Sequence, residues 1–204
     1  MRIQPDFLHE FVPGNSSRTL LLLHGTGGNE RDLLPLGREL DPNASLLSPR
    51  GKILENGMPR FFRRLAEGVF DLEDLKTRTN ELADFVSAAV RHYKLDADHI
   101  VGVGYSNGAN IAASMLLLRP EIMHAAILFR AMVPLVPDKM PELSSVHVWI
   151  GAGDQDPIIP SSEAQGLVEL LRQAGAEVTI RFFHAGHGLT SSEIETAGQW
   201  LTNL

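Results

Sequence analysis

The segment GYSNG at residues 104–108 places a serine between two glycines, at the end of an apolar run. The run at residues 100–105 is continuous, as in a buried strand, and small residues after Ser106 lead into a helical pattern at residues 107–118. A sharp strand-to-helix turn exposes its central residue at the carboxyl edge of a sheet, and the flanking glycines allow the turn to be tight. The pattern predicts a nucleophilic serine; an ordinary tight turn with a capping serine is the alternative.

A serine hydroxyl is a weak nucleophile at neutral pH, so it needs a base, and the base needs an acid that orients it. In folds with this turn the chain order is serine, acid, histidine, each on a loop after a strand. The segment FFHAGHGLT holds His184 and His187 between the last predicted strand and the last predicted helix. We predict that His187, between two glycines, is the base and that His184, nearer the strand, is structural.

The acid is expected in the segment GAGDQDPIIP, which follows the predicted strand at residues 146–150. Asp154 and Asp156 both qualify, and the spacing alone does not choose between them. Asp156 precedes Pro157, which favours an extended backbone at the aspartate. The alternative for either residue is a turn-forming aspartate, which is common in loops.

An oxyanion hole requires two N–H groups aimed at the developing negative charge. One comes from the residue after the nucleophile, here Asn107, and the other from a glycine-rich loop after an earlier strand. The segment LLLLHGTGGNE supplies that loop, and the N–H of Thr26 is the candidate. His24 precedes the serine and is interpreted as a hydrogen-bonding residue that fixes the loop. No Walker lysine follows the glycines, so a phosphate-binding loop is not indicated.

The composition excludes several other classes of function. The net charge of −7 and the lack of a basic block argue against a nucleic-acid partner. The chain has no cysteine, which excludes disulfides, thiolate metal sites and a cysteine nucleophile. We expect no metal and no cofactor. Without a signal-like N-terminus or a membrane-length apolar run, the expected location is cytoplasmic, with no membrane span.

Short apolar runs alternate with longer helical patterns along the chain, which predicts one α/β domain over residues 1–204. Continuous apolar runs are typical of strands covered on both faces, and hence of a parallel sheet. The predicted strands are residues 7–12, 19–23, 44–47, 100–105, 125–129, 146–150 and 178–183. The predicted helices are residues 30–40, 72–93, 107–118, 162–174 and 191–201, the last capped by Ser191 or Ser192 and the fourth ended by Gly175.

The segments HGTGG, GYSNG, GDQDPIIP and AGHG together resemble the small carboxylesterase/phospholipase family of α/β-hydrolases, relatives of the acyl-protein thioesterases. The resemblance covers nearly the whole chain. It implies a mostly parallel central sheet with helices on both faces and suggests a homodimer. It matches the catalytic serine, acid and histidine to Ser106, Asp156 and His187, and this match is the reason for preferring Asp156. It also matches the oxyanion donors to Thr26 and Asn107.

Two further segments, LSPRG and RFFRRLAEGVFDLEDL, resemble a bacterial subgroup of this family, some members of which are linked to quinone stress. The thioesterase branch typically has a tryptophan–phenylalanine pair where this chain has Phe61 and Phe62. It has a serine–glycine segment where this chain reads RAMVP at residues 130–134. Both segments are expected at the acyl side of the pocket, so thioesterase specificity is not carried over.

The candidate substrate-binding residues are Phe61, Phe62, Phe70 and Met132. The alternative is that some of them are core residues. Arg63 and Arg64 are either attractants for an anionic substrate or ordinary surface arginines. Predicted strands and helices take most of the segment between Ser106 and Asp156, so no cap domain fits and the site is expected to be shallow and open.

These observations predict a serine esterase that hydrolyses small-molecule carboxylic esters through an acyl-enzyme. Two alternatives stay open on the sequence. One is a thioesterase or lysophospholipase with the same three residues. The other, of a different class, is a hydrolase-like fold that only binds a small molecule.

Overall fold

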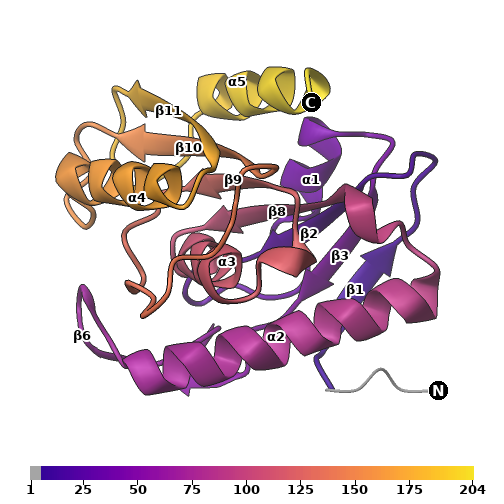
Figure 1. The fold of residues 1–204 in the computed structure, drawn as a ribbon, viewed down its shortest axis with the longest axis horizontal. Helices are drawn as coiled ribbons and strands as arrows, with labels where there is room; N and C mark the ends of the chain where they lie inside the picture. Colours follow the sequence, from indigo (N-terminus) through magenta and orange to yellow (C-terminus); the bar gives the residue numbers. More distant parts are fainter. Residues whose placement is uncertain (1–5) are drawn as a thin grey trace.

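The computed structural model describes residues 6–204, and within that range the chain forms a seven-stranded sheet flanked by helices (Figure 1). The strand order is β1-β3-β2-β8-β9-β10-β11, with β1 antiparallel to β3 and the other neighbours parallel. The strands are β1 His9–Val12, β2 Thr19–Leu23, β3 Ser45–Pro49, β8 Ile100–Tyr105, β9 Ala125–Phe129, β10 His147–Gly153 and β11 Glu177–Phe183. The helices are α1 Leu34–Leu40, α2 Leu72–Tyr93, α3 Asn107–Leu118, α4 Ser161–Gln173 and α5 Ser191–Thr202, with short 3-10 turns η1 Ala97–His99 and η2 Pro120–Ile122.

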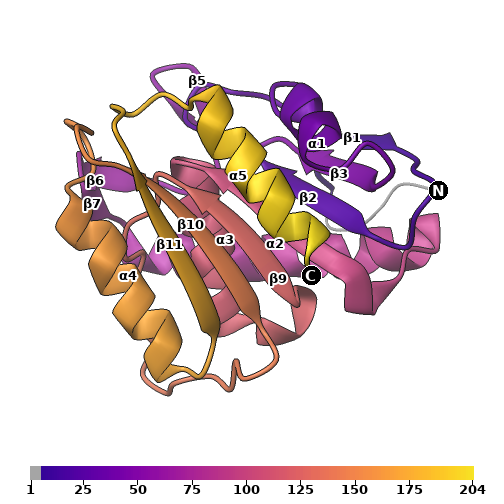
Figure 2. The same ribbon diagram turned by 90° about the horizontal axis from the view of Figure 1, so that it is seen from above.

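The central strands are buried on both faces because helices cover both sides of the sheet. Leu21 and Leu23 of β2 pack in the core that α2, α3 and α4 cover, whereas Leu20 and Leu22 pack in the core beneath α1 and α5. Figures 1 and 2 show these two helical layers on opposite sides of the strands. The predicted mostly parallel sheet with helices on both faces is confirmed. The prediction succeeds because a strand that is buried on both faces must be apolar at every position, which gives a continuous apolar run in the sequence.

The end of α4 and the start of α5 both follow known capping rules, and the cap of α5 differs from the predicted one. Gly175 has a φ of +98° after α4 and ends that helix as predicted, in a left-handed conformation that glycine adopts without strain. Helix α5 is capped by Thr190 rather than by Ser191 or Ser192. The Thr190 side chain accepts the N–H of Glu193 while the Glu193 carboxylate accepts the N–H of Thr190, and this reciprocal pair fixes the start of the helix.

The segment between β3 and α2 forms two small hairpins that the sequence did not predict. Strands β4 Ile53–Glu55 and β5 Met58–Arg60 pair with each other, as do β6 Arg64–Ala66 and β7 Val69–Phe70. Strands of two or three residues are too short to show a hydrophobic period. The predicted helix at residues 30–40 begins only at Leu34, and its first residue, Glu30, forms an ion pair with Arg50 instead.

The fold carries no cap domain in the part of the chain that the structure describes. Between Ser106 and Asp156 the chain forms α3, η2, β9, β10 and their connecting loops. None of the helices in residues 6–204 combines the length and the apolar surface that a bilayer crossing requires.

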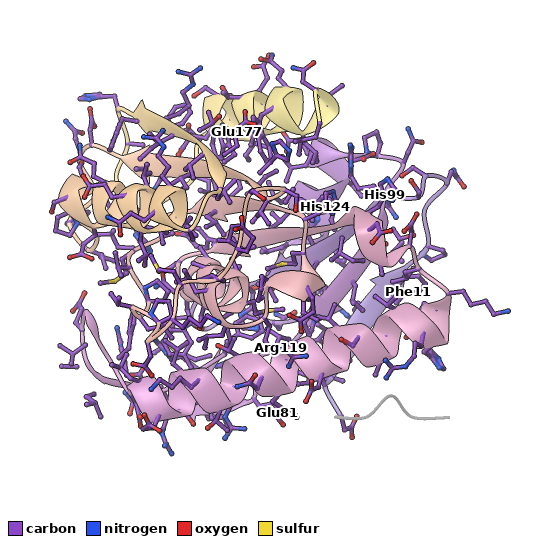
Figure 3. All side chains as sticks on the ribbon, in the orientation of Figure 1. Phe11, Glu81, His99, Arg119, His124 and Glu177 are labelled. Carbon is purple, nitrogen blue, oxygen red and sulfur yellow. The ribbon has the colours of Figure 1, made fainter. Side chains whose placement is uncertain are left out.

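A group of histidines lies at the amino-terminal edge of the sheet, where β8, β9 and β10 begin. Figure 3 shows His99 and His124 side by side, and their ring centroids are 5.9 Å apart. Nδ1 of His124 is buried and has no hydrogen-bond partner among residues 6–204. Burial, followed by the nearby charges of His99, Arg18 and His147, lowers the pKa of His124 below its usual 6.5.

A lowered pKa means that the unfolded chain binds this proton more readily than the folded protein does. The free energy of unfolding therefore falls as the pH drops below about 6.5. We expect His124→Gln to lose less stability between pH 7.5 and 5 than the unsubstituted protein, as measured by urea unfolding. His92→Gln, at an exposed histidine of α2, is the matched control. An unchanged pH dependence in His124→Gln would contradict the assignment.

Candidate active site

The turn between β8 and α3 holds Ser106 in an unusual backbone conformation, with φ 53° and ψ −114°. Two features on either side make this turn possible. A Cβ on Gly108 would lie 1.9 Å from the carbonyl oxygen of Leu23, and one on Gly104 would lie 2.5 Å from Cα of Ala109. Only glycine allows these approaches, so α3 packs directly against the ends of β2 and β8 and Ser106 stands at the carboxyl edge of the sheet.

Three side chains that are far apart in the sequence form one chain of hydrogen bonds at this edge. Nε2 of His187 lies 3.0 Å from Oγ of Ser106, and Nδ1 of His187 lies 2.7 Å from Oδ2 of Asp156. The other carboxylate oxygen of Asp156 accepts the N–H groups of Ile158 and Ile159, at 2.8 and 3.1 Å. The Asp156 side chain is 1% exposed, so its orientation is fixed on both oxygens.

The alternative acid and histidine form a separate pair. Nδ1 of His184 lies 3.4 Å from Oδ2 of Asp154, and these side chains are 77% and 47% exposed. An exposed pair of this kind contributes little to stability. The structure therefore brings Asp156 and His187 to Ser106, and leaves Asp154 and His184 in solvent.

The two residues predicted to supply the oxyanion N–H groups lie beside Ser106. Thr26 and Asn107 both line a cavity there, and neither backbone N–H donates to another group in residues 6–204. Oγ1 of Thr26 accepts a hydrogen bond from Nη1 of Arg60 at 2.9 Å, which fixes the threonine. The Asn107 side chain accepts the N–H of Phe61 at 2.8 Å.

His24 holds the glycine-rich loop, as the sequence predicted. Its Nδ1 lies 2.7 Å from the carbonyl oxygen of Gly25, and its Nε2 accepts the N–H of Gly51 at 3.0 Å. Burial lowers the pKa of His24, which favours the neutral ring that this pair of hydrogen bonds requires. Its role is to connect the Thr26 loop to the chain after β3.

The cavity beside Ser106 has a volume of about 50 Å³ and opens to solvent. Phe70 and Met132 line it, whereas their predicted role in substrate binding stays a prediction. Phe61 and Phe62 do not line it, which corrects the prediction: they are 2% and 0% exposed and belong to the core beneath α2 and α3. Phe62 packs against Phe70 with ring centroids 5.0 Å apart, so it supports the cavity wall from behind.

Several lining residues were not singled out in the sequence. Arg60, Asn110, Ile158 and Ile159 join Arg64 in the cavity wall. Arg63 is 59% exposed and pairs with Asp71 instead. Arg60 ends β5 and Arg64 begins β6, with a bend at residues 61–62 between them, so no local period in the sequence separates these two arginines from Arg63.

The two arginines of the wall share one carboxylate. Oε1 of Glu55 accepts from Nε of Arg64 at 2.9 Å, and Oε2 lies 3.1 Å from Nη1 of Arg60. The hydrogen bond from Arg64 lowers the pKa of Glu55 below its usual value. Two positive charges therefore face one negative charge, with the exposed Glu67 at the rim of the cavity.

A mostly parallel sheet with a serine at a strand-to-helix turn, and a histidine on the loop after the last strand, defines the α/β-hydrolase class. The sequence profile of the Dienelactone hydrolase family matches residues 63–198. The chain belongs to this family, and it is a carboxylic-ester hydrolase.

Individual relatives agree with this assignment. A Bacillus subtilis (strain 168) protein named as a hydrolase, MhqD, is 48% identical over 192 residues, which span 94% of this chain and 96% of that protein. A Bacillus cereus carboxylesterase of known structure is 49% identical, with a TM-score of 0.95 over 98% of this chain and 95% of its own. A structure of YahD with malic acid is 34% identical, with a TM-score of 0.91 over 97% and 98% of the two chains.

The close approach of backbone at the Ser106 turn leads to a prediction about stability. In Gly108→Ala the added methyl group would overlap the carbonyl of Leu23, so we expect the free energy of unfolding to fall by about 3 kcal/mol or more. Gly198→Ala in α5 is the control: its Cβ meets nothing nearer than 3.7 Å, and alanine favours a helix by up to about 1 kcal/mol. Urea unfolding measures both, and equal stability of the two variants would contradict the close approach.

Proposed function

We propose that the protein is a serine esterase in which Ser106 attacks the acyl carbon of a carboxylic ester. His187 accepts the serine proton through Nε2, while Asp156 orients the ring and stabilises its cationic form. The observation that carries this proposal is the continuous path from Oγ of Ser106 through the imidazole to Asp156, with distances of 3.0 and 2.7 Å.

The rest of the cycle follows from the same groups. The N–H groups of Thr26 and Asn107 stabilise the oxyanion, and His187 then donates its proton to the leaving alcohol oxygen. Water, deprotonated by His187, attacks the acyl carbon of the acyl-enzyme. The bond to Oγ of Ser106 then breaks, His187 returns the proton to that oxygen, and the acid is released. The N–H of Asn107 is the first of α3, so the helix N-terminus adds to the stabilisation of negative charge.

A thioester or a lysophospholipid would pass through the same acyl-enzyme, so these activities are the alternatives on the same site. Comparing kcat/KM for matched esters, acyl-thioesters and lysophospholipids separates them. The cavity beside Ser106 is small and partly polar, which suits a short acyl group better than the long acyl chain of a lysophospholipid.

The roles in the triad can be tested by substitution. We expect Ser106→Ala and Asp156→Asn each to lower kcat at least about a thousandfold, and Ser106→Ala to abolish labelling by a fluorophosphonate probe. Ser87→Ala, on α2 away from the site, is the control and should label normally. Full esterase activity in Ser106→Ala would refute the mechanism.

The cavity wall supports a preference for acyl groups that carry a second oxygen function. Oδ1 of Asn110 accepts the N–H of Met132 at 2.9 Å, so its amide nitrogen is the group left to donate elsewhere. Arg64 uses Nε for Glu55, and its two terminal nitrogens have no partner in residues 6–204. The relative YahD has a structure solved with malic acid, which is a dicarboxylic acid. We infer that a monoester of a short dicarboxylic acid is preferred.

Methyl butyrate and monomethyl succinate have similar acyl length but differ in charge, so they isolate this preference. We expect kcat/KM to be about tenfold higher for monomethyl succinate, and the advantage to disappear in Arg64→Gln, because a charge-assisted hydrogen bond contributes about 1.5 kcal/mol or more. Arg63→Gln, at the exposed neighbouring arginine, should leave the ratio unchanged. A ratio unaffected by Arg64→Gln in pH-stat assays would contradict the preference.

A further inference from the structure

The loop that carries His187 contains two glycines that its surroundings do not require. A Cβ on Gly186 would approach nothing closer than the carbonyl oxygen of Gln155 at 3.8 Å, and one on Gly188 would meet nothing within 4 Å. Neither glycine has a left-handed φ. Glycine at these two positions therefore increases the freedom of the backbone on either side of His187. Gly153 lies directly against the carbonyl groups of Ala185 and Gly186, which holds the start of the loop. A catalytic base needs a fixed orientation, so the residues after Ala185 need further interactions that hold them.

Two side chains bind three successive carbonyl groups of this loop. The guanidinium of Arg130 donates from Nε to Gly186 O at 2.9 Å and from Nη2 to Gly188 O at 2.7 Å. The hydroxyl of Tyr105 donates to the carbonyl oxygen of His187 at 3.0 Å. The planar fork of arginine thus spans the catalytic residue, with one hydrogen bond on each side of it.

Arg130 is itself fixed from both ends. It follows β9 with a φ of 57°, and its N–H donates to Gly151 O of β10 at 2.9 Å. Its guanidinium donates to both carboxylate oxygens of Glu193, at 2.5 and 2.9 Å, and the two side chains are 1% and 0% exposed. Glu193 belongs to the first turn of α5 and forms the capping box with Thr190. The start of α5 is thereby connected to the loop of His187.

Arg130 and Glu193 also affect the electrostatic environment of Asp156 and His187. Nε of Arg130 lies 3.8 Å from Oδ2 of Asp156, the oxygen that binds His187. Without Glu193, the buried guanidinium would oppose the formation of an imidazolium ion. Because Glu193 neutralises Arg130, Asp156 remains the uncompensated charge beside the ring, and it favours the imidazolium that forms during reaction.

We propose that Arg130 and Glu193 are positioning residues for the esterase reaction: Arg130 fixes the loop of His187 through its two flanking carbonyl groups, and Glu193 both orients Arg130 and cancels its charge. The inference rests on the proposed function of Ser106 and His187. The groups that face His187 are Asp156, the hydroxyl of Ser106, the ring of Tyr105 and, through Asp156, the pair Arg130–Glu193. The exposed pair Asp154–His184 lies on the same two loops.

Three substitutions separate the geometric role from the electrostatic one. Arg130→Lys keeps the charge but loses the fork, so kcat should fall about tenfold or more with KM nearly unchanged, and the acid limb of the kcat/KM profile should stay in place. Arg130→Met leaves Glu193 uncompensated, which favours the protonated base. Its kcat should fall about a hundredfold, and its acid limb should move up by about half a pH unit or more. Glu193→Gln keeps the capping geometry but exposes the charge of Arg130, so its acid limb should move down.

Arg38→Met is the matched control. Arg38 lies on α1 and, like Arg130, donates hydrogen bonds to loop carbonyl groups, here those of Pro42 and Ala44. It is far in sequence from Ser106, Asp156 and His187. It should change neither kcat nor the pH profile. Circular dichroism checks folding, and if Arg130→Met does not fold, the contrast between Arg130→Lys and Glu193→Gln carries the test.

Acid limbs that move in the same direction in Arg130→Met and Glu193→Gln, or that stay in place in Glu193→Gln, would overturn the electrostatic role. A kcat in Arg130→Lys equal to that of the unsubstituted enzyme would overturn the geometric one. These results differ from a failure of the proposed function itself, which would appear as esterase activity that survives Ser106→Ala.

Discussion

The turn at Ser106 is the constraint on which the remaining architecture depends. A serine at φ 53° and ψ −114° is strained, and the conformation persists because its surroundings determine it. The Ser106 N–H donates to Phe129 O of β9, its carbonyl accepts the first hydrogen bond of α3, and Gly108 lies against the end of β2. Three adjacent strands and one helix therefore fix the backbone of a single residue. Its hydroxyl hydrogen-bonds to His187, and the next N–H has no partner among residues 6–204.

The remaining groups reach this residue because parallel strands end at the same edge of the sheet. β8, β10 and β11 lead to Ser106, Asp156 and His187 respectively. The loops after the strands are free to differ in sequence, whereas the sheet fixes where they begin. Beneath them, two buried carboxylates share one guanidinium, since Arg130 contacts Glu193 directly and lies 3.8 Å from Asp156. Arg130 thereby fixes the carbonyl groups on either side of His187, and the ring of His187 packs against Tyr105 with centroids 5.5 Å apart.

Much of the fold could be predicted from local sequence. Strands β2, β8 and β9 and helices α2 and α3 have the predicted bounds, because continuous apolar runs and a 3.6-residue period are strong signals. The hairpins β4–β7 were missed because strands of two or three residues have no period. Phe61 and Phe62 were assigned to the pocket because phenylalanine is common both in protein cores and in the walls of apolar cavities, and the sequence does not distinguish the two environments. Which of the two it occupies depends on the path of the hairpins.

The sequence by itself determined the strand–serine–helix turn and the candidates for the base and the acid, because glycine spacing and chain order act over a few residues. Spacing left Asp154 and Asp156 equivalent, and family resemblance was needed to prefer one of them. Only the tertiary structure decided which carboxylate meets His187, which arginines face the cavity, and that Arg130 binds Glu193, 63 positions away. Contacts of this kind depend on where separate strands end in space, and no local pattern encodes that position.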